Sequence, residues 1–422
     1  MTAEIGMLNK YAVALAADSA VTVSSGNGKS KVYNSANKLF KLSNHEPIGI
    51  MIYGNASFMG VPWETIIKLY SKKLAKKDFN LVEDYANDFL NYITNLIIPE
   101  SDIKNHIRVM AWNLISVFNE DASIDNKYNL ETWIKEYTLF MDRKKTCFTI
   151  NEDCMQYINS ILIPDCIEFF SIEGNYHNSN EPITKDIAEM FVNLFLLYLS
   201  KDRDTSASGI VIAGFGNEEI YPSIHTYEIE GKISSMLFYK KNQNKSSFIS
   251  SDNRAFVAPF AQASMIETFI NGINPNLEDI YQREIYKNIS EFTNELAEEL
   301  KNILELNETT SSTLKTELNS KAHDFFFDKI YSFLAKYKND NHTMPLINAV
   351  SMLGKNDLAH MAESLVNIAS MDKKMSMELE SVGGPIDVAI ISKGDGFIWY
   401  KRKHYFNLDL NPDYFTRKET QC

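Results

Sequence analysis

The chain has 422 residues, 45% of them hydrophobic and 23% charged, which are ordinary proportions for a globular protein and exclude collagen-like, low-complexity and disordered classes. The 55 acidic residues outnumber the 42 lysines and arginines. The resulting net charge of −13 argues against a general nucleic-acid binder or a protein that binds anionic membranes. At roughly 100–200 residues per domain, this length predicts two domains or one heavily inserted domain.

Cysteine usage and hydropathy point to the cytoplasm. The four cysteines form neither a disulfide framework nor a set with zinc-ligand spacing. The start of the sequence lacks the basic and apolar regions of a signal peptide. The longest near-apolar run, Met190–Leu199, is shorter than the ~20 residues that span a bilayer. We expect a cytoplasmic protein with no metal, no cofactor, and neither nucleic acid nor a membrane as a partner.

The first 60 residues have the pattern of short strands linked by turns. Tyr11–Ala17 is a continuous apolar run of strand length that ends abruptly at Asp18. Residues 38–42 alternate as a strand does, and Ile48–Tyr53 is a second apolar run that stops at Gly54. This part of the chain is therefore expected to form an antiparallel or mixed sheet.

Helical patterning begins at Pro62 and continues to about residue 200. Strand patterns return over residues 209–213, 220–229 and 232–239. A further helical block runs from about residue 262 to residue 375. Strands therefore lie on both sides of each helical block.

The chain closes with two strands, residues 386–392 and 397–401, around a Gly-Asp-Gly turn that is a strong hairpin signal. Within the second helical block, the polar stretch over residues 302–321 is expected to be a solvated helix or a loop. Strands at both ends and in the middle, with helices between them, predict an α+β fold rather than a doubly wound one.

Thr2 is the first residue with catalytic potential. It follows the initiator methionine, and a small second residue permits removal of that methionine, which would leave Thr2 with a free α-amine. Taken alone, each candidate also has a plain structural explanation. Many chains begin Met-Thr, Asp18 suits a turn, Lys38 suits a strand edge, and Gly54 suits a strand-to-helix turn.

Taken in order, these residues resemble the N-terminal-nucleophile hydrolases, specifically the proteasome β-subunit and its bacterial relative HslV. The spacing from Thr2 to Asp18 is that between nucleophile and aspartate in the family, and Ala16–Ser19 resembles its AADS element. Asn37–Leu42 is similar to the strand that carries its catalytic lysine, here Lys38. The resemblance covers about residues 2–75, 205–275 and 345–402.

Two further elements support the same resemblance. Met51–Ala56 is similar to the family's MAGGAAD element, with Asn55 in place of the second glycine. Ser381–Gly384, followed by a strand and the turn Gly394–Gly396, resembles the family's C-terminal ending.

The resemblance implies a fold and an explanation for the excess length. The fold would be an αββα four-layer sandwich, one domain over residues 1–422, with helical insertions at residues 80–200 and 275–345. The insertions would be decoration, an oligomer contact, a lid or a docking site. A homo-oligomer is expected, with an ATPase or another pathway protein as a further partner.

The resemblance also implies a mechanism. Thr2 would be the nucleophile and its α-amine the base, since a threonine hydroxyl needs an adjacent base. Lys38 would lower the pKa of that amine, and Asp18 would hold Lys38 charged. The Gly54 N–H would donate to the oxyanion, and Ser381 would complete the catalytic set.

Two further sets of residues belong to this scheme. A second polar cluster should support the amine, and the candidates for it are Gln262, Ser264, Glu378, Glu380 and Ser381. The specificity pocket would be lined by Val21, Thr22, Ala36, Phe40, Ile52 and Ala56. Because these residues are uncharged and mostly apolar, we expect cleavage after apolar residues.

Three functions remain open from the sequence. The first is a threonine peptidase that acts on a peptide or protein. The second is an N-terminal-nucleophile amidohydrolase that acts on a small amide, since one fold hosts many chemistries. The third is a catalytically silent scaffold or assembly protein. The set of Thr2, Asp18 and Lys38 favours the first two, because a scaffold has no reason to hold a lysine beside a free N-terminus.

Overall fold

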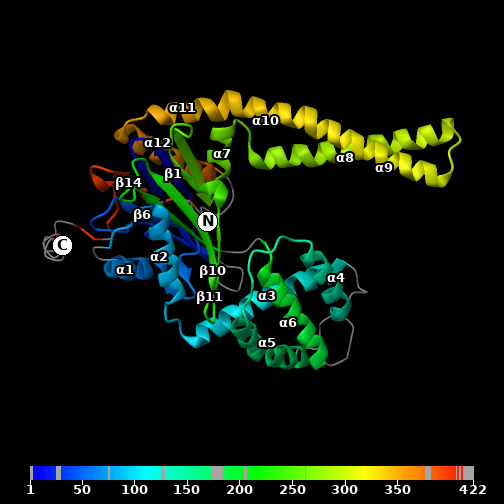
Figure 1. Cartoon of the computed structure of the whole chain (residues 1–422), viewed down its shortest axis with the longest axis horizontal. Helices are drawn as coiled ribbons and strands as arrows, with labels where there is room; N and C mark the ends of the chain where they lie inside the picture. The colour runs from blue at the N-terminus through cyan, green and yellow to red at the C-terminus, as the bar shows by residue number, and fades with distance from the viewer. Residues whose placement is uncertain are drawn as a thin grey trace. The chain divides into compact units, whose positions relative to one another are not determined.

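The computed structural model describes residues 3–24, 30–74, 77–124, 129–172, 184–203, 207–261, 263–375, 382–404, 406–407 and 410–411. The chain divides into two compact units. The first unit comprises Met1–Leu39, Ile220–Ser223 and Phe248–Cys422, and the second comprises Phe40–Glu219 and Ile224–Ser247. Figure 1 shows the elements of both units, which are described separately below.

The first unit is built on a five-stranded sheet in the order β13-β1-β2-β14-β15, in which every neighbouring pair is antiparallel. All seven residues of β1 and all five of β2 are buried, which agrees with their nearly continuous apolar sequences. The strands are β1 (Ala3–Asn9), β2 (Val13–Ala17), β13 (Ala255–Ala261), β14 (Asp387–Ser392) and β15 (Gly396–Lys401), and a separate hairpin joins β3 (Val21–Ser24) to β4 (Ser30–Tyr33).

Helices cover one face of this sheet. Helix α12 (Lys355–Met375) contacts β1, β2 and β14, while α11 (Met344–Met352) contacts β1 and β13, and α7 (Ser264–Asn271) packs on α12. Ala3, Ile5 and Met7 of β1 belong to the resulting core. Because side chains alternate along a strand, Glu4 lies on the opposite face of β1.

A long helical segment extends from the same unit between α7 and α11, and we call residues 275–343 the arm (Figure 1). Asn274 caps its first helix by accepting hydrogen bonds from the backbone N–H groups of Asn276 and Leu277, and Asn307 caps the second. The arm consists of α8 (Pro275–Ile303), α9 (Glu308–Phe325), the π-helical segment η2 (Phe326–Tyr331), α10 (Ser332–Lys338) and a second π-helical segment η3 (Asn339–Thr343).

The second unit contains a six-stranded sheet with the main order β11-β10-β9-β6-β5. Strand β10 pairs antiparallel with β11, and β6 pairs antiparallel with β9, with Ile50 of β6 opposite Ile212 of β9. The strands are β5 (Leu39–Lys41), β6 (Ile48–Gly54), β9 (Ser208–Gly214), β10 (Ser223–Ile233), β11 (Met236–Lys241) and the short β12 (Ser247–Phe248), and a small hairpin joins β7 (Ser57–Phe58) to β8 (Val61–Pro62).

Two helical groups belong to this unit. Helices α1 (Trp63–Leu74) and α2 (Val82–Thr94) share one core with the sheet through their apolar faces, at helical spacing. The remaining helices form a second core around Phe118, Trp133 and Phe195. They are α3 (Glu100–Ile124), α4 (Leu130–Asp142), α5 (Glu152–Ile172) and α6 (Lys185–Ser200).

The predicted α+β class with two large helical insertions is confirmed, since the two units supply two sheets and two layers of covering helices. The expectation of one domain over residues 1–422 stays a prediction. Some boundaries differ: β2 begins at Val13, and β10 and β11 together replace the strands expected at 220–229 and 232–239. Most of the polar stretch after residue 302 is helix α9, which Asn307 initiates.

No helix in the described part of the chain is both long enough and apolar enough to cross a membrane.

Candidate active site

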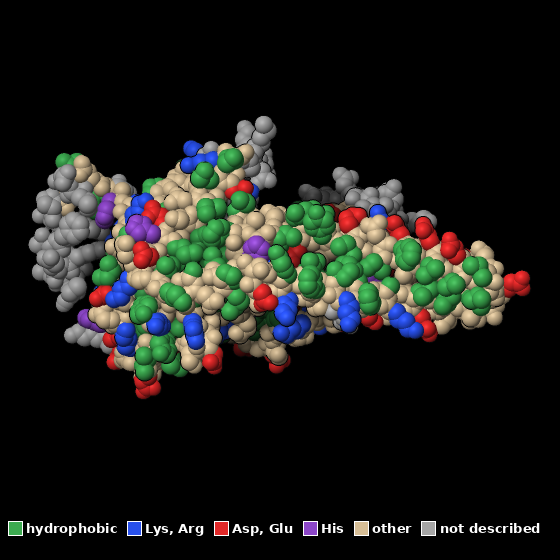
Figure 2. Space-filling model, turned by 90° about the horizontal axis from the view of Figure 1, so that it is seen from above, with side chains coloured by type: hydrophobic (Ala, Val, Ile, Leu, Met, Phe, Trp, Pro, Cys, Tyr) green, Lys and Arg blue, Asp and Glu red, His purple; other side chains and the backbone are tan. Residues whose placement is uncertain are grey.

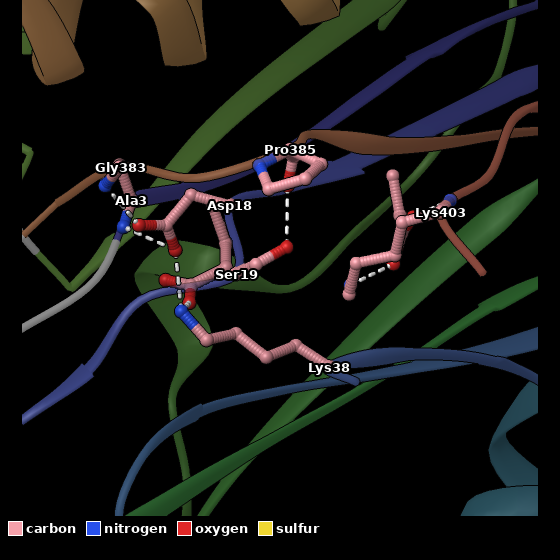
Figure 3. A network of polar contacts seen from close by, with 9 residues as sticks. Ala3, Asp18, Ser19, Lys38, Gly383, Pro385 and Lys403 are labelled. Carbon is pink, nitrogen blue, oxygen red and sulfur yellow. Dashed lines mark hydrogen bonds and ion pairs between the residues drawn. The ribbon is translucent and has the colours of Figure 1, made fainter. Parts of the chain in front are cut away.

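Three charged side chains meet in the interior of the first unit. Glu4 comes from β1, Asp18 follows the last residue of β2, and Lys38 directly precedes β5. Their side chains are 0%, 1% and 4% exposed, in that order. The Lys38 Nζ atom lies 3.2 Å from Glu4 Oε1 and donates a hydrogen bond to Asp18 Oδ1 (Figure 3). One ammonium is therefore held by two carboxylates, away from solvent.

The Asp18 carboxylate also joins distant parts of the chain. Its Oδ1 accepts the backbone N–H of Ala3 at 3.3 Å, and its Oδ2 accepts the backbone N–H of Gly383 at 2.9 Å. The backbone N–H of Asp18 in turn donates to the Ala3 carbonyl at 3.1 Å. Asp18 thus fixes the start of β1 against the end of β2 and against the loop that precedes β14.

That loop is tied down by Ser19. The Ser19 N–H donates to the Gly383 carbonyl at 3.2 Å, and the Ser19 hydroxyl donates to the Pro385 carbonyl (Figure 3). Gly384 has φ +78°, and a Cβ there would lie 2.9 Å from Asn34 Cβ. Glycine is needed at this position for both its backbone conformation and the space available. The loop that delivers the Gly383 N–H to Asp18 is therefore specified by local sequence.

A second buried ion pair lies near the cluster. Lys403 Nζ pairs with Asp387 Oδ2, and the Lys403 backbone N–H donates to Asp387 Oδ1 at 2.8 Å. Asp387 is opposite Ala17 in the register of β14 and β2, one residue from Asp18. In Figure 3, Lys403 lies to the right of Asp18 and Ser19, and no dashed line joins it to Asp18 or Lys38. This pair anchors the end of β15 to the sheet.

The cluster of Glu4, Asp18 and Lys38 holds two negative charges and one positive charge when all three groups are ionised. Withdrawing an ion from water costs several kcal/mol, and an ion pair regains this only with excellent geometry. Buried ionisable groups with specific partners are for this reason candidates for function. The arrangement offers a fixed cation to a reacting group and a net negative environment that stabilises one further positive charge.

Several predicted site residues lie outside the described residues. They are Thr2, Gln262, Glu378, Glu380 and Ser381. Thr2 directly precedes Ala3, whose N–H is bonded to Asp18. Ser264, the remaining candidate for the second polar cluster, is the first residue of α7 and is half-buried.

The structure places three of the predicted pocket residues in the first unit. Val21 and Thr22 open strand β3, and both are half-buried. Ala36 is also half-buried, and its N–H donates to the carbonyl of Ser19 at 3.1 Å. These three positions follow or contact the Asp18–Ser19 corner, and their role in a pocket stays a prediction.

The other predicted positions belong to the second unit. Phe40 and Ile52 are buried in the core beneath α1 and α2, and Ala56 is exposed. Gly54 ends β6 with φ +77°, and a Cβ there would lie 2.7 Å from the Ala207 carbonyl oxygen. Packing against Ala207 is a sufficient reason for this glycine. The pocket roles of Phe40, Ile52 and Ala56, and the oxyanion role of Gly54, stay predictions.

Glu4 is the site residue that sequence reasoning missed. It is a carboxylate within a strand whose other residues are apolar, small or terminal, and it is completely buried. A charged side chain buried in a strand needs a partner of opposite charge. A single glutamate among the other residues of Ala3–Asn9 was therefore a sign, readable from the sequence, that Glu4 has such a partner. The identity of the partner depended on where Lys38 lies in the fold.

Among the described residues, no group of three or more His, Cys, Asp and Glu side chains is arranged to hold a metal ion.

Comparison with known proteins gives no family assignment. No protein-family model matches the chain, and no curated protein matches it. Solved structures of Anbu proteins are similar to it, each with 9% sequence identity. One is a Gly-1 mutant from Hyphomicrobium sp. strain MC1, aligned over 100% of this chain and 95% of its own with a TM-score of 0.30. Another is an Anbu protein, called an ancestral beta-subunit, from Yersinia bercovieri, aligned over 99% and 95% with a TM-score of 0.29.

These findings correct the family assignment made from the sequence. Membership of the family of bacterial proteasome β-subunits and HslV is not upheld, because no family model matches and the similar structures are Anbu proteins. TM-scores near 0.3 are too low to argue fold or function from the likeness. Any function must therefore be argued from the site itself.

Proposed function

We propose that this chain is a threonine peptidase that hydrolyses peptide bonds with Thr2, once freed as the N-terminal residue, as its nucleophile. The observation that carries the proposal is the buried Lys38 ammonium, held by Asp18 and Glu4 at the start of β1. A purely structural role for this cluster is disfavoured, because apolar side chains of similar volume stabilise a core at least as well as a buried ion pair does.

Chain geometry supports Thr2 as the residue that uses this lysine. Consecutive Cα atoms are about 3.8 Å apart, and Thr2 is the residue immediately before Ala3, whose N–H is bonded to Asp18. Side chains alternate along a strand, so positions 2 and 4 share a face wherever β1 continues by one residue. Glu4 already contacts Lys38 from that face.

The proposed reaction needs only groups of this chain. As the Thr2 hydroxyl attacks the substrate carbonyl, the α-amine of Thr2 accepts the hydroxyl proton. The amine then returns that proton to the departing amine of the substrate, which leaves an ester on Thr2. A water molecule attacks the ester with the α-amine again as base, and the freed acid departs while Thr2 regains its hydroxyl. General acid–base assistance of this kind contributes roughly 10²–10⁴-fold.

Lys38 and its two carboxylates tune the amine. The ammonium of Lys38 favours the neutral form of a nearby amine, which is the form that acts as a base. Asp18 and Glu4 hold the Lys38 side chain in place. Their excess negative charge opposes the effect of Lys38, so we propose that the amine becomes neutral, and the enzyme active, only at neutral to alkaline pH.

The uncharged residues Val21 and Ala36 beside the Asp18–Ser19 corner favour cleavage after apolar residues. We propose a peptide or protein as the substrate, with a small amide as the alternative that a substrate panel separates. Activity confined to peptides with acidic residues before the cleaved bond would contradict the apolar preference. A cytoplasmic location and an ATPase or pathway partner are further proposals that the cluster itself does not address.

The decisive experiment is intact-protein mass spectrometry of the purified full-length chain after incubation with a peptide epoxyketone. The expected result is a mass starting at Thr2, with one covalent adduct at that residue. Thr2→Ala should form no adduct and Thr2→Ser should retain part of the reaction. Both variants keep a small residue at position 2, so removal of the preceding residue is preserved.

Lys38→Met, with Lys41→Met as the matched control, tests the role of the ammonium. Lys41 is exposed on β5, three residues away, and its Nζ donates to the nearby Asn44 carbonyl at 3.2 Å. We expect Lys38→Met to abolish adduct formation and Lys41→Met to leave it unchanged. Retention of residues before Thr2 in the native protein, or an adduct in Thr2→Ala, would refute the proposal.

A further inference from the structure

The arm packs polar side chains inward. Between α8 and α9, the Ser290 hydroxyl lies 2.9 Å from His323 Nε2, and Asn319 bonds to Thr293 and Asn294. The buried residues are Thr293 and Ala297 in α8 and Ser311 in α9, all of them small. Leu296, Leu300, Leu314 and Leu318 are half-buried, but no large apolar side chain of α8 or α9 is fully buried, although apolar burial is what normally stabilises such helices.

Large apolar side chains of the arm face solvent instead. Figure 2 shows hydrophobic side chains clustered along the arm and acidic side chains at its far end. The exposed set includes Phe292 (64%), Ile303 (73%), Leu304 (59%), Phe325 (64%), Phe333 (65%) and Leu334 (51%). Clustered exposure of this kind on a folded protein marks an interaction site.

An aromatic cavity lies at the base of the arm. Its volume is about 430 Å³, within the ~300–1,000 Å³ range of ligand pockets. Its walls come from α8, η2, α10 and η3, and they include Tyr281, Ile285, Phe326, Tyr331, Leu334 and Tyr337. Two π-helical segments border it, and such segments occur frequently at functional sites.

The charges of the arm are segregated along its length. Residues 290–308, at the far end, contain six acidic side chains and one lysine. Residues 326–338, which border the cavity, contain three lysines and one aspartate. Glu278 and Lys338 pair with each other at the cavity, with N–O distances of 2.7 and 2.9 Å. Over the whole base, residues 275–289 and 326–343, five acidic and five basic side chains balance. The tip is therefore strongly acidic, whereas the base is neutral overall and carries its lysines on residues 326–338.

We propose that the arm is the docking site for a second copy of this chain, with the two arms antiparallel and the tip of each on the aromatic cavity of the other. A two-fold pair of this kind uses the same surface on both copies. The antiparallel direction sets each acidic tip beside the lysines of residues 326–338 on the other copy, whereas a parallel pair would bring two acidic tips together.

The pairing also completes the packing of the arms. Ile303 and Leu304 at each tip enter the cavity between α8 and α10 of the other copy. Glu298 and Glu299 then lie beside Lys329 and Lys336 of the other copy. Two helical hairpins associated in this way form a four-helix bundle, with the exposed apolar rows at its centre. The inference is independent of the proposed peptidase activity.

The test is sedimentation velocity on the full-length chain over a wide concentration range. The wild type should be a reversible dimer. Ile303→Glu at the tip and Leu334→Glu in the cavity should each weaken dimerisation at least tenfold, while the control Met352→Glu should not. Met352 is 79% exposed at the end of α11, outside the arm. A monomer at every concentration, or a dimer that neither arm variant weakens, would overturn the proposal.

A charge exchange distinguishes this interface from any other dimer. Lys329→Glu with Lys336→Glu should weaken the dimer about tenfold, which corresponds to ~1.4 kcal/mol. Adding Glu298→Lys and Glu299→Lys should restore dimerisation, because the tip of each copy then carries lysines that face the new glutamates of the other copy. Lys315→Glu, the same charge change in the middle of α9, is the control. Failure of the second pair of changes to restore the dimer would contradict the antiparallel arrangement.

Cross-linking gives a direct reading of the same contact. With Cys147 and Cys422 replaced by serine, Ile303→Cys and Leu334→Cys together should form dimers linked by disulfides under mild oxidation. Each single cysteine variant should not, since the antiparallel pairing brings position 303 to position 334 of the other copy. Equal linkage in a single variant would argue for a different register and against the tip-to-cavity contact.

Discussion

Lys38 Nζ lies 3.2 Å from Glu4 Oε1, and the two side chains are 4% and 0% exposed. With Asp18 as the second carboxylate, this contact creates a buried cluster that carries more negative than positive charge. Its stability, its effect on the proposed chemistry and its dependence on the loop at Gly384 each give a measurable expectation.

Replacing Lys38 by methionine should destabilise the first unit by about 3–5 kcal/mol, because two buried carboxylates lose their cation. The measurement is the midpoint of urea unfolding, and Lys41→Met is the control, with an expected change within about 0.5 kcal/mol. An equal effect of the two substitutions would mean that the cluster is not held by the ammonium.

Replacing Glu4 by glutamine keeps the shape of the side chain and removes one buried negative charge. The Thr2 amine should then lose its proton at lower pH, because the carboxylate that favours its charged form is absent. In a plot of kcat/KM against pH, the rise on the acid side should therefore move to lower pH. Thr2 should remain the nucleophile. An unshifted profile in an active Glu4→Gln variant would contradict a role for Glu4 in setting the charge on the amine.

Gly384→Ala should destabilise the protein by roughly 1–3 kcal/mol, since it puts a side chain at φ +78° and 2.9 Å from Asn34 Cβ. The displaced loop should also withdraw the Gly383 N–H from Asp18 and lower the proposed activity. Gly394→Ala is the matched control, because a Cβ there meets nothing within 4 Å. Thermal unfolding and the rate of adduct formation check both statements.

Stability in the second unit should depend on His225 in mildly acidic solution. Burial, with a smaller contribution from the charge of Lys241, lowers the pKa of His225 from 6.5 to about 4. The unfolded chain therefore binds a proton at higher pH than the folded chain does, so stability rises with pH between about 4 and 6.5. His225→Gln should flatten that part of the curve of melting temperature against pH, and an unchanged slope would contradict the assignment.

The pattern of strands and helices was readable because it depends on neighbours along the chain. The apolar run ending at Asp18 became β2, and the run ending at Gly54 became β6. The alternation around Lys38 produced only a three-residue strand, since the chain leaves the sheet after Lys41. Local periodicity predicts which segments form strands better than it predicts where their hydrogen bonding stops.

For the candidate site, the sequence by itself determined that Asp18 and Lys38 flank buried strands and could form a pair, and that pair is present. Only the tertiary structure decided that Glu4 joins them, and that the Gly383 N–H, 365 residues along the chain, completes the shell of Asp18. It also decided that α8 and α9 bring Ser290 to His323 and Asn294 to Asn319. The regular alternation of side chains along a strand or helix determines which residues share a face. The partner of a buried charge depends instead on contacts between segments that are distant in the sequence, and a local sequence pattern does not contain that information.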